Sequence, residues 1–477
     1  MALVPLLVLA AGRGARRGLF LGACFGIGFF GALLVWISLV GWLSWAVLAT
    51  SQAAFVAAFG ACWALAGRAR WPLARVLAPP ALWVAVVEYL RSVLPAGGFP
   101  WGQLAQSQAG VPWLLSLSSL AGGWLVALAV VAINAVVAEA FRSRASLRRG
   151  VVLPLALAAG VVLAAPVLVP ASSGQGRPLR VAIVQGGVPA GFGADSAAKQ
   201  LAIIQRHRRL TARLRPGSAD LVVWPESSVG LDLERVPEVA RAVRAAARAA
   251  RAPLVIGGNL DLGPDRYRVM AFLVSPTGGI VESYQKTHLV PFGEYIPARR
   301  WLEWIPMLDQ IPRDAVAGDE PGLFEVAGGT VAPVISFEGD FGPLVRARIG
   351  RGGRLLVVAT NTSTWGTSWA SAQHLAFSRV RAAENGVWVV HAALSGISAY
   401  VAPDAGVFGT IPLGRSATGI ARTRFVADIS LYARTGDWLP RASVILSVAA
   451  LLSGALAGST ERVRARRAFG PAWSKRP

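Results

Sequence analysis

Three segments of the chain carry, at the end of a strand-like stretch, side chains that can do nucleophilic or acid–base chemistry. Leu221–Glu226 runs from an apolar, strand-like stretch directly into a carboxylate. Lys286 and Glu294 follow in a segment punctuated by proline and glycine, and Val331–Ser336 ends in a hydroxyl. A nucleophile, a carboxylate base and a lysine are the parts that covalent acyl transfer requires.

The three residue types divide the work of such a reaction. Glu226 would accept the proton of the nucleophile, Ser336 would attack the carbonyl, and Lys286 would stabilise the oxyanion that forms. Each residue taken alone also fits a cap, an ion pair or a turn, so a structural ion-pair cluster remains the alternative. Sites in open α/β sheets gather where strands end, which favours the catalytic interpretation.

Strand-like and helical patterns alternate around these residues. Short β-branched runs predict strands at residues 181–185, 221–224, 253–257, 272–275, 331–336 and 355–360. Apolar residues at helical spacing predict amphipathic helices over residues 234–251 and 373–385. This alternation predicts an α/β domain whose sheet is covered by helices on its faces.

The composition places the rest of the chain in a membrane. Hydrophobic residues make up 54% of the 477 residues, charged residues only 15%, and mean hydropathy is +0.51. A bilayer-spanning helix needs about 20 apolar residues. Stretches of that kind lie at residues 18–38, 42–66, 77–94, 113–140, 150–170 and 441–459. The shorter apolar segment Met1–Ala11 reads as a remnant helix and lacks the features of a cleavable signal peptide.

Arginine clusters beside these stretches predict the orientation. They occupy alternate connections, at residues 13–17, 68–75, 142–149 and 462–467. The positive-inside rule then places residues 171–439 on the outer face. This pattern accounts for much of the net charge of +22, so nucleic-acid binding is not expected.

The expected domain order follows from these boundaries. Transmembrane helices fill residues 1–170, a linker 171–179, the α/β domain 180–438, a last transmembrane helix 439–460 and a basic cytoplasmic tail 461–477. Both cysteines lie in apolar stretches and the four histidines show no ligand spacing, so neither a disulfide nor a metal site is expected.

Several longer strings resemble one protein family. WPE around Glu226, YQKTHLVPFGEYIP around Lys286 and ISFE around Ser336 are similar to the Glu, Lys and Cys segments of the nitrilase, or carbon–nitrogen hydrolase, superfamily. More narrowly they resemble apolipoprotein N-acyltransferase, as do residues 88–108, 373–399 and 432–438. The likeness covers most of the chain except its beginning, where one helix of the family is missing.

The resemblance implies a fold, a reaction and partners. The fold would be a membrane α-helical bundle carrying an αββα nitrilase-like sandwich on the outer face of the bacterial inner (cytoplasmic) membrane. The reaction would move an acyl chain from phospholipid to the N-terminal diacylglyceryl-cysteine of a lipoprotein, without a cofactor. Glu226 would be the base and Lys286 the oxyanion donor, with Glu294, Glu338 and Asn361 in support.

The sequence departs from the family at its central position. Ser336 occupies the cysteine slot, and the outer domain contains no cysteine at all. A thiol has a pKa near about 8.5, whereas an alcohol must lose its proton in concert with attack. The family's Tyr-x-Asn-Ser-Ala pattern reads here as Tyr267–Ala271, and its Asn-Asp-x-Trp-Phe-Gly pattern as Asn361–Gly366. Changes at several positions indicate natural divergence of the site.

Three functions are compatible with this sequence. The first is a working acyltransferase that uses Ser336. The second is a catalytically silent or weakened paralogue that binds lipid or serves a membrane partner, such as a polyprenol-phosphate mannosyltransferase. The third is a membrane-tethered amide hydrolase. Retention of Glu226, Lys286, Glu294 and Glu338 argues against complete decay, because burying ions without a role costs several kcal/mol.

A tryptophan-bearing segment follows the lysine loop. Trp301, Trp304, Ile305 and Leu308 stand at helical spacing in a proline-rich stretch. One interpretation is a lid that dips into the outer leaflet and admits lipid, since tryptophan favours that interface. The alternative is a lid that packs on its own domain.

Overall fold

The computed structural model describes residues 1–68, 72–142, 160, 174–189 and 197–468. The chain divides into two compact units, which are described separately. The membrane unit comprises Met1–Leu104, Trp124–Val167 and Asp437–Pro477. The sandwich unit comprises Ala105–Gly123 and Leu168–Gly436.

The sandwich unit contains two mixed sheets. The first has the order β13-β1-β2-β3-β4-β5, with β6 pairing β4, and the second has the order β12-β11-β10-β9-β8-β7. The strands of the first sheet are β1 (Gly176–Gln185), β2 (Leu221–Val223), β3 (Leu254–Asp261), β4 (Arg266–Val274), β5 (Ile280–Gln285), β6 (Asp314–Ala315) and β13 (Ala417–Val426). Those of the second are β7 (Phe324–Val326), β8 (Gly329–Ile335), β9 (Leu355–Thr360), β10 (Trp388–Ala393), β11 (Ser398–Val401) and β12 (Val407–Ile411).

Both faces of the central strands are buried, which explains their continuous apolar runs. Along β1, Val181 and Ile183 face the core between the sheets, while Ala182 and Val184 face the helices. The second sheet repeats this alternation, because Val357 of β9 joins the same inner core and its neighbours face outward. Successive side chains of a strand point to opposite faces, so each strand contributes to two cores.

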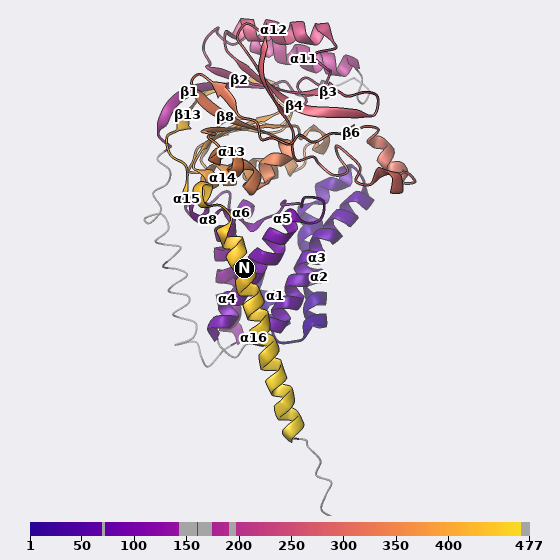
Figure 1. Ribbon diagram of the computed structural model, residues 1–477, viewed down its shortest axis with the longest axis vertical. Coiled ribbons are helices and arrows are strands. Elements are labelled where there is room, and N and C mark those ends of the chain that lie inside the picture. Colours follow the sequence, from indigo (N-terminus) through magenta and orange to yellow (C-terminus); the bar gives the residue numbers. More distant parts are fainter. Residues whose placement is uncertain (69–71, 143–159, 161–173, 190–196, 469–477) are drawn as a thin grey trace, which may run out of the picture. The chain divides into compact units, whose positions relative to one another are not determined.

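Helices cover the outer face of each sheet. Helices α11 (Ala197–Thr211) and α12 (Pro237–Ala250) pack on the first sheet, and α13 (Gly342–Gly350), α14 (Ala370–Asn385) and α15 (Leu431–Thr435) on the second. Figure 1 shows these layers within the unit. The arrangement is the αββα sandwich expected from the sequence.

The predicted elements of this unit are present with shifted ends. β9 has the predicted bounds, whereas β1, β3 and β4 extend further than their most apolar residues indicated. The predicted helix over 234–251 is α12, and that over 373–385 is the end of α14. Among the described residues, seven strands escaped prediction. Several of them are short or carry polar residues on one face, as β6 and β13 do.

One segment between membrane helices belongs to the sandwich unit. Residues 105–123 form the short helices α7 (Pro112–Leu115) and α8 (Ser118–Ala121), which pack on α14 and α15. The main-chain N–H of Gly123 donates to Glu384 Oε1 at 2.6 Å. The expected span over 113–140 was therefore wrong at its start, because the apolar residues before Gly123 cover the sandwich instead.

The membrane unit contains five described helices that are long and apolar enough to cross a bilayer. These are Ala15–Leu33 (α2), Trp42–Ala66 (α3), Ala74–Val93, Gly123–Arg142 (α9) and Trp438–Ala457 within α16 (Trp438–Ala468). The third combines most of α4 (Pro72–Leu82) with a π-helix, η2 (Trp83–Leu90), and α5 (Arg91–Val93). The predicted span over 150–170 lies outside the described residues. The apolar start of the chain forms a single short helix, α1 (Val4–Ala10).

Glycines let α2 and α3 approach closely. Gly18, Gly22 and Gly26 repeat every fourth residue and are buried on one face of α2. A Cβ on Gly22 would lie 2.4 Å from the carbonyl oxygen of Val56, and one on Gly18 would lie 2.2 Å from that of Gly60. Small residues at this spacing are the usual means by which membrane helices pack backbone to backbone.

Ionisable residues are also buried within this unit. Arg91 is fully buried and donates to the carbonyl oxygens of Val87, Phe99 and Trp101 at 2.6–2.7 Å. Its guanidinium also lies over the ring of Phe30. These bonds fasten the loop after α5 to the helix that carries Arg91.

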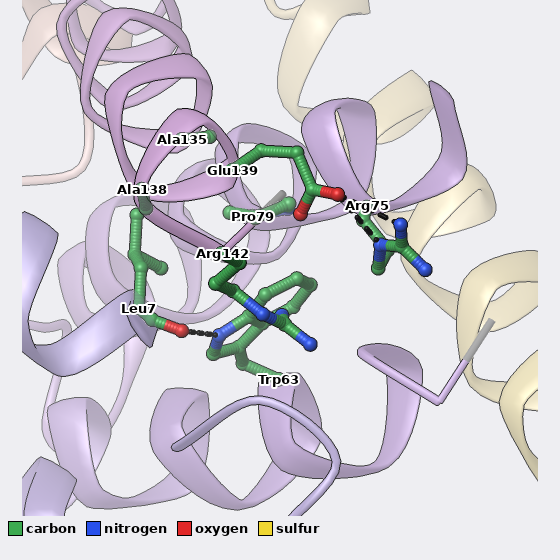
Figure 2. Close-up of a pocket in the computed structure, with 8 residues that line it drawn as sticks. All are labelled: Leu7, Trp63, Arg75, Pro79, Ala135, Ala138, Glu139 and Arg142. Carbon is green, nitrogen blue, oxygen red and sulfur yellow. Dashed lines mark hydrogen bonds and ion pairs between the residues drawn. The ribbon is translucent and has the colours of Figure 1, made fainter. Parts of the chain in front are cut away.

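A partly buried ion pair lies among the residues that line a small pocket of this unit. Arg75 pairs with Glu139 at 2.7 Å, and the indole N–H of Trp63 donates to the carbonyl oxygen of Leu7 at 2.9 Å. Figure 2 shows both interactions. Ion pairs inside an apolar helix bundle satisfy charges that would be costly alone.

Candidate active site

Ser336 stands at a sharp turn where β8 ends. Strand β8 stops at Ile335, and Ser336 opens the short 3-10 helix η6 (Ser336–Asp340) with φ of +49°. Few residues other than glycine adopt this left-handed conformation, so the surrounding structure must hold it. The half-buried hydroxyl lies 3.2 Å from Thr360 Oγ1 at the end of β9.

Lys286 lies between two carboxylates. Its side chain is fully buried, and Nζ lies 2.6 Å from Glu294 Oε1 and 3.4 Å from Glu226 Oε1. The hydroxyl of Ser336 is close enough to the Glu226 carboxylate to lower the pKa of that group. The structure thus brings Glu226, Lys286, Glu294 and Ser336 together from three separate segments.

The charges of this cluster perturb one another. Burial raises the pKa of the Glu226 carboxyl and the negative charge of Glu294 raises it further, whereas Lys286 and the Ser336 hydroxyl oppose the change. Burial alone would lower the pKa of Lys286, but the two glutamates outweigh it and raise the pKa above its ordinary value. Lys286 therefore remains an ammonium ion, and Glu226 holds a proton more readily than an exposed glutamate does.

Glu338 organises the main chain around the cluster. Its fully buried carboxylate accepts hydrogen bonds from the main-chain N–H groups of Ile335 and Thr287 at 2.9 Å and of His288 at 3.2 Å. One carboxylate thereby fixes both the turn before Ser336 and the loop after Lys286. Glu338 is a positioning residue, because its bonds go to the main chain that carries the reactive groups.

Two residues that the sequence did not single out complete this support. The Tyr284 hydroxyl donates to Glu338 Oε1 at 2.5 Å, and Arg348 of α13 contacts both residues, reaching Glu338 at 3.4 Å. Burial raises the pKa of Tyr284, so the phenol stays protonated. Tyr284 lies two residues before Lys286 and offered a local signal, whereas Arg348 is connected to the site only through the fold.

The two segments that diverge from the family pattern begin with residues that match it, Tyr267 and Asn361, and these two residues lie differently. Tyr267 is close enough for the charges of Glu294 and Lys286 to affect it, although burial is the main reason that its pKa rises to about 12. Asn361 follows β9, and its side-chain oxygen accepts hydrogen bonds from the main-chain N–H and the hydroxyl of Ser363. These recorded bonds of Asn361 shape the loop rather than reach the cluster.

A buried imidazole lies behind the turn of Ser336. His374 of α14 interacts with the main chain of Ser336, and its Nε2 lies 3.5 Å from Asp340 Oδ1. Burial lowers the pKa of His374 to about 4, so the ring is neutral near pH 7. The turn is therefore supported on one side by Glu338 and on the other by His374.

The tryptophan segment is not one helix. Arg299–Trp301 and Pro306–Gln310 form two short 3-10 turns, because prolines interrupt the helical spacing. Trp301 is 68% exposed and Trp304 79% exposed. Both rings therefore face away from the domain, contrary to a lid packed on its own sandwich.

Within the described part of the chain, no three side chains of His, Cys, Asp or Glu gather in a way that could hold a metal ion. The charged groups of the site are instead paired with one another, as Lys286 is with Glu294.

Comparisons with known proteins match both halves of the chain. Residues 1–136 match the apolipoprotein N-acyltransferase N-terminal domain, and residues 180–426 match the carbon-nitrogen hydrolase domain. The apolipoprotein N-acyltransferase of Gloeobacter violaceus is 31% identical over 485 residues, which cover 98% of this chain and 91% of the relative. That of Geobacter metallireducens is 29% identical over 458 residues, covering 92% and 87% respectively.

Among solved structures, an amidase from Nesterenkonia sp. aligns with 53% of this chain and 94% of its own, at 21% identity and a TM-score of 0.40. The matches to curated relatives extend over both the membrane helices and the sandwich. The chain therefore belongs to the apolipoprotein N-acyltransferase family and is a bacterial membrane protein with a carbon-nitrogen hydrolase domain.

Proposed function

We propose that this protein transfers an acyl chain from phospholipid to the N-terminal diacylglyceryl-cysteine of lipoproteins, with Ser336 as the nucleophile. One arrangement carries the proposal: the Glu226 carboxylate lies 3.4 Å from the buried Lys286 ammonium, and the Ser336 hydroxyl is close enough to Glu226 to lower the pKa of its carboxyl. Nucleophile, base and oxyanion donor are therefore in mutual reach, which is the geometry that acyl transfer demands.

The first step would load the enzyme. Ser336 Oγ attacks the ester carbonyl of the phospholipid while its proton passes to Glu226. The oxyanion forms beside the Lys286 ammonium. Glu294 Oε1 lies 2.6 Å from Lys286 Nζ, and its negative charge keeps the ammonium protonated. Collapse breaks the bond to the glycerol oxygen, which takes the proton from Glu226 and leaves as lysophospholipid.

The second step would deliver the acyl chain. The free amine of the acceptor attacks the Ser336 ester, and Glu226 again accepts the proton. The bond between the carbonyl carbon and Oγ then breaks, and Oγ is reprotonated by Glu226. The product is an amide, and the enzyme returns to its starting state without a cofactor.

The membrane helices would keep this chemistry at the lipid surface. The arginine clusters favour a multi-pass arrangement with the sandwich unit on the outer face of the inner membrane. Trp301 and Trp304, both highly exposed, suit an interfacial lid over which a phospholipid enters.

A silent paralogue is the second candidate, and the chemistry of Ser336 favours it. Glu226 is a weaker base than the histidine that usually activates a serine. An oxygen ester is also a poorer acyl donor to an amine than a thioester. In this case the intact cluster would hold the fold, and the protein would act as a lipid-binding or membrane partner.

The decisive experiment uses the full chain in detergent with a labelled phospholipid and a diacylglyceryl peptide. Intact mass spectrometry would detect an acyl adduct, and peptide mapping would locate it. We expect an adduct on Ser336 together with acylated peptide. Ser336→Ala should abolish both, and Ser336→Cys should retain or increase them.

The variants separate the two candidates. If the native protein and Ser336→Cys form the acyl adduct and Ser336→Ala does not, the result supports the serine mechanism. If the native chain forms no adduct while Ser336→Cys does, the scaffold is competent and the native protein is silent. An adduct that persists in Ser336→Ala would exclude Ser336 as the nucleophile.

A further inference from the structure

We infer that a cavity beside α11, apart from the Ser336 cluster, binds a phosphate-class anion. The cavity has a volume of about 340 Å³ and is lined by residues from five segments of the sandwich unit. Those that could contact a ligand are Lys199, Arg206, Ser363, Thr364, Ser395 and Gly187. Neither Glu226, Lys286 nor Ser336 is among the lining residues.

The two cations come from one face of one helix. Lys199 lies in the first turn of α11 and Arg206 two turns later. Residues seven apart on an α-helix lie on the same side, so both side chains can be directed at one ligand. Arg206 Nη1 lies 3.3 Å from the carbonyl oxygen of Gly186, which orients the guanidinium beside the loop that follows β1.

The opposite wall supplies hydrogen-bonding groups. Ser363 and Thr364 belong to the turn after β9, and Ser395 follows β10. Strands β1, β9 and β10 therefore end around the same cavity, as strands do at ligand sites in α/β folds. Hydroxyls and small loops can approach anion oxygens closely, while Arg and Lys neutralise their charge.

The charge of the cavity is positive and stays so near neutral pH. None of the described residues that line it is acidic. His207, the next residue after Arg206, is buried and accepts a hydrogen bond from the main-chain N–H of Gly186. Burial lowers the pKa of His207 to about 4, so this ring adds no charge. The field at the cavity thus comes from the two α11 cations.

The size and the polar walls select a class of ligand. Cavities for small organic molecules measure about 300–1,000 Å³ and are mostly apolar. This one lies at the lower end, with charged and hydroxyl-bearing walls, which suits phosphate or a phosphate ester rather than an acyl chain. Free phosphate and the phosphate of a lipid headgroup share that chemistry.

The test measures binding of radiolabelled inorganic phosphate to the detergent-solubilised full chain by equilibrium dialysis. We expect saturable binding that weakens about tenfold or more in Lys199→Gln and in Arg206→Gln, because a charged hydrogen bond is lost. Arg209→Gln is the matched control, since Arg209 lies on the same helix, is exposed and does not line the cavity. It should bind phosphate as the native protein does.

Competition then identifies the source of the phosphate. Displacement of phosphate by water-soluble dihexanoyl phosphatidylglycerol would support a lipid headgroup as the ligand. Displacement by glycerol 3-phosphate but not by the phosphatidylglycerol would support a soluble anion. The proposal fails if phosphate does not bind saturably, or if Lys199→Gln binds as the native chain does while circular dichroism shows it folded. Arg206→Lys, which keeps the charge, should retain most of the affinity.

Discussion

Each unit of this protein buries an ionised residue completely, but the two residues are surrounded differently. In the membrane unit, Arg91 donates to main-chain carbonyls at 2.6–2.7 Å and thereby ties a loop to its helix. In the sandwich unit, Lys286 pairs with two carboxylates, and the pKa of one of these, Glu226, is also lowered by the nearby hydroxyl of Ser336.

The comparison distinguishes an ion that only stabilises the fold from one that lies beside groups able to exchange a proton. The hydrogen bonds of Arg91 go to main-chain carbonyls and to Gln52, which cannot titrate. Its nearby carboxylate, Glu88, accepts from Trp83 and from the main-chain N–H of Leu104 rather than from a nucleophile, so these contacts stabilise a conformation. The second carboxylate beside Lys286 raises the pKa of the first, so Glu226 can exchange a proton with the adjacent hydroxyl. Burial alone therefore does not distinguish the two sites, whereas the kind of partner does.

Replacing Lys286 should have the largest effect. Lys286→Met leaves Glu226 and Glu294 buried without their cation, which costs about 3–5 kcal/mol of folding free energy. It also removes the oxyanion donor, so acyl transfer should fall by at least about 100-fold. Denaturant unfolding and the intact-mass assay measure the two losses; a stable, active Lys286→Met protein would contradict the assignment.

Replacing Arg91 should cost stability but not chemistry. Arg91→Met frees the loop carbonyls of Phe99 and Trp101 and should destabilise the protein by about 3 kcal/mol. The fraction that remains folded should transfer acyl chains at the native rate, as a rate per folded molecule would show. A loss of rate in well-folded Arg91→Met would mean that the two buried ions are functionally coupled.

Replacing Glu294 tests whether its negative charge raises the pKa of Glu226. A base works only when ionised, so activity should rise with pH as Glu226 loses its proton. Glu294→Gln removes a negative charge that raises the pKa of Glu226. The acid limb of the pH–rate profile should then move to lower pH. Glu282→Gln, a glutamate outside the cluster on β5, is the control and should leave the limb in place.

The smallest effect on folding is expected at the exposed tryptophans. Trp301→Ala with Trp304→Ala should change the free energy of unfolding by less than about 0.5 kcal/mol, because both rings are exposed. If the segment is an interfacial lid, transfer from vesicle phospholipid should drop while transfer from a water-soluble short-chain phospholipid is preserved. Equal loss with both donors would assign these residues to the reaction centre instead.

The sequence predicted the parts of this structure whose signals are local. Glu226 and Ser336 each follow an apolar run, and Lys286 stands in a string that resembles the nitrilase superfamily. The alternation around them predicted a sheet covered by helices, and the family resemblance implied the αββα class. Arg348 could not be found this way, because its contact with Glu338 depends on how α13 packs against the second sheet. The proline-rich stretch around Trp301 was predicted as a lid, and its two short 3-10 turns follow from Pro306, which interrupts the helical spacing of its apolar residues.

The segment over residues 105–123 limits how this protein can be divided. Its two short helices complete the surface of α14 and α15, although about fifty residues separate it from the first strand of the sandwich. A secreted fragment that begins at residue 174 would lack this cover and leave the Glu384 carboxylate without the N–H of Gly123. A soluble version would instead need residues 105–123 supplied in trans or grafted through a short connector to the start of β1.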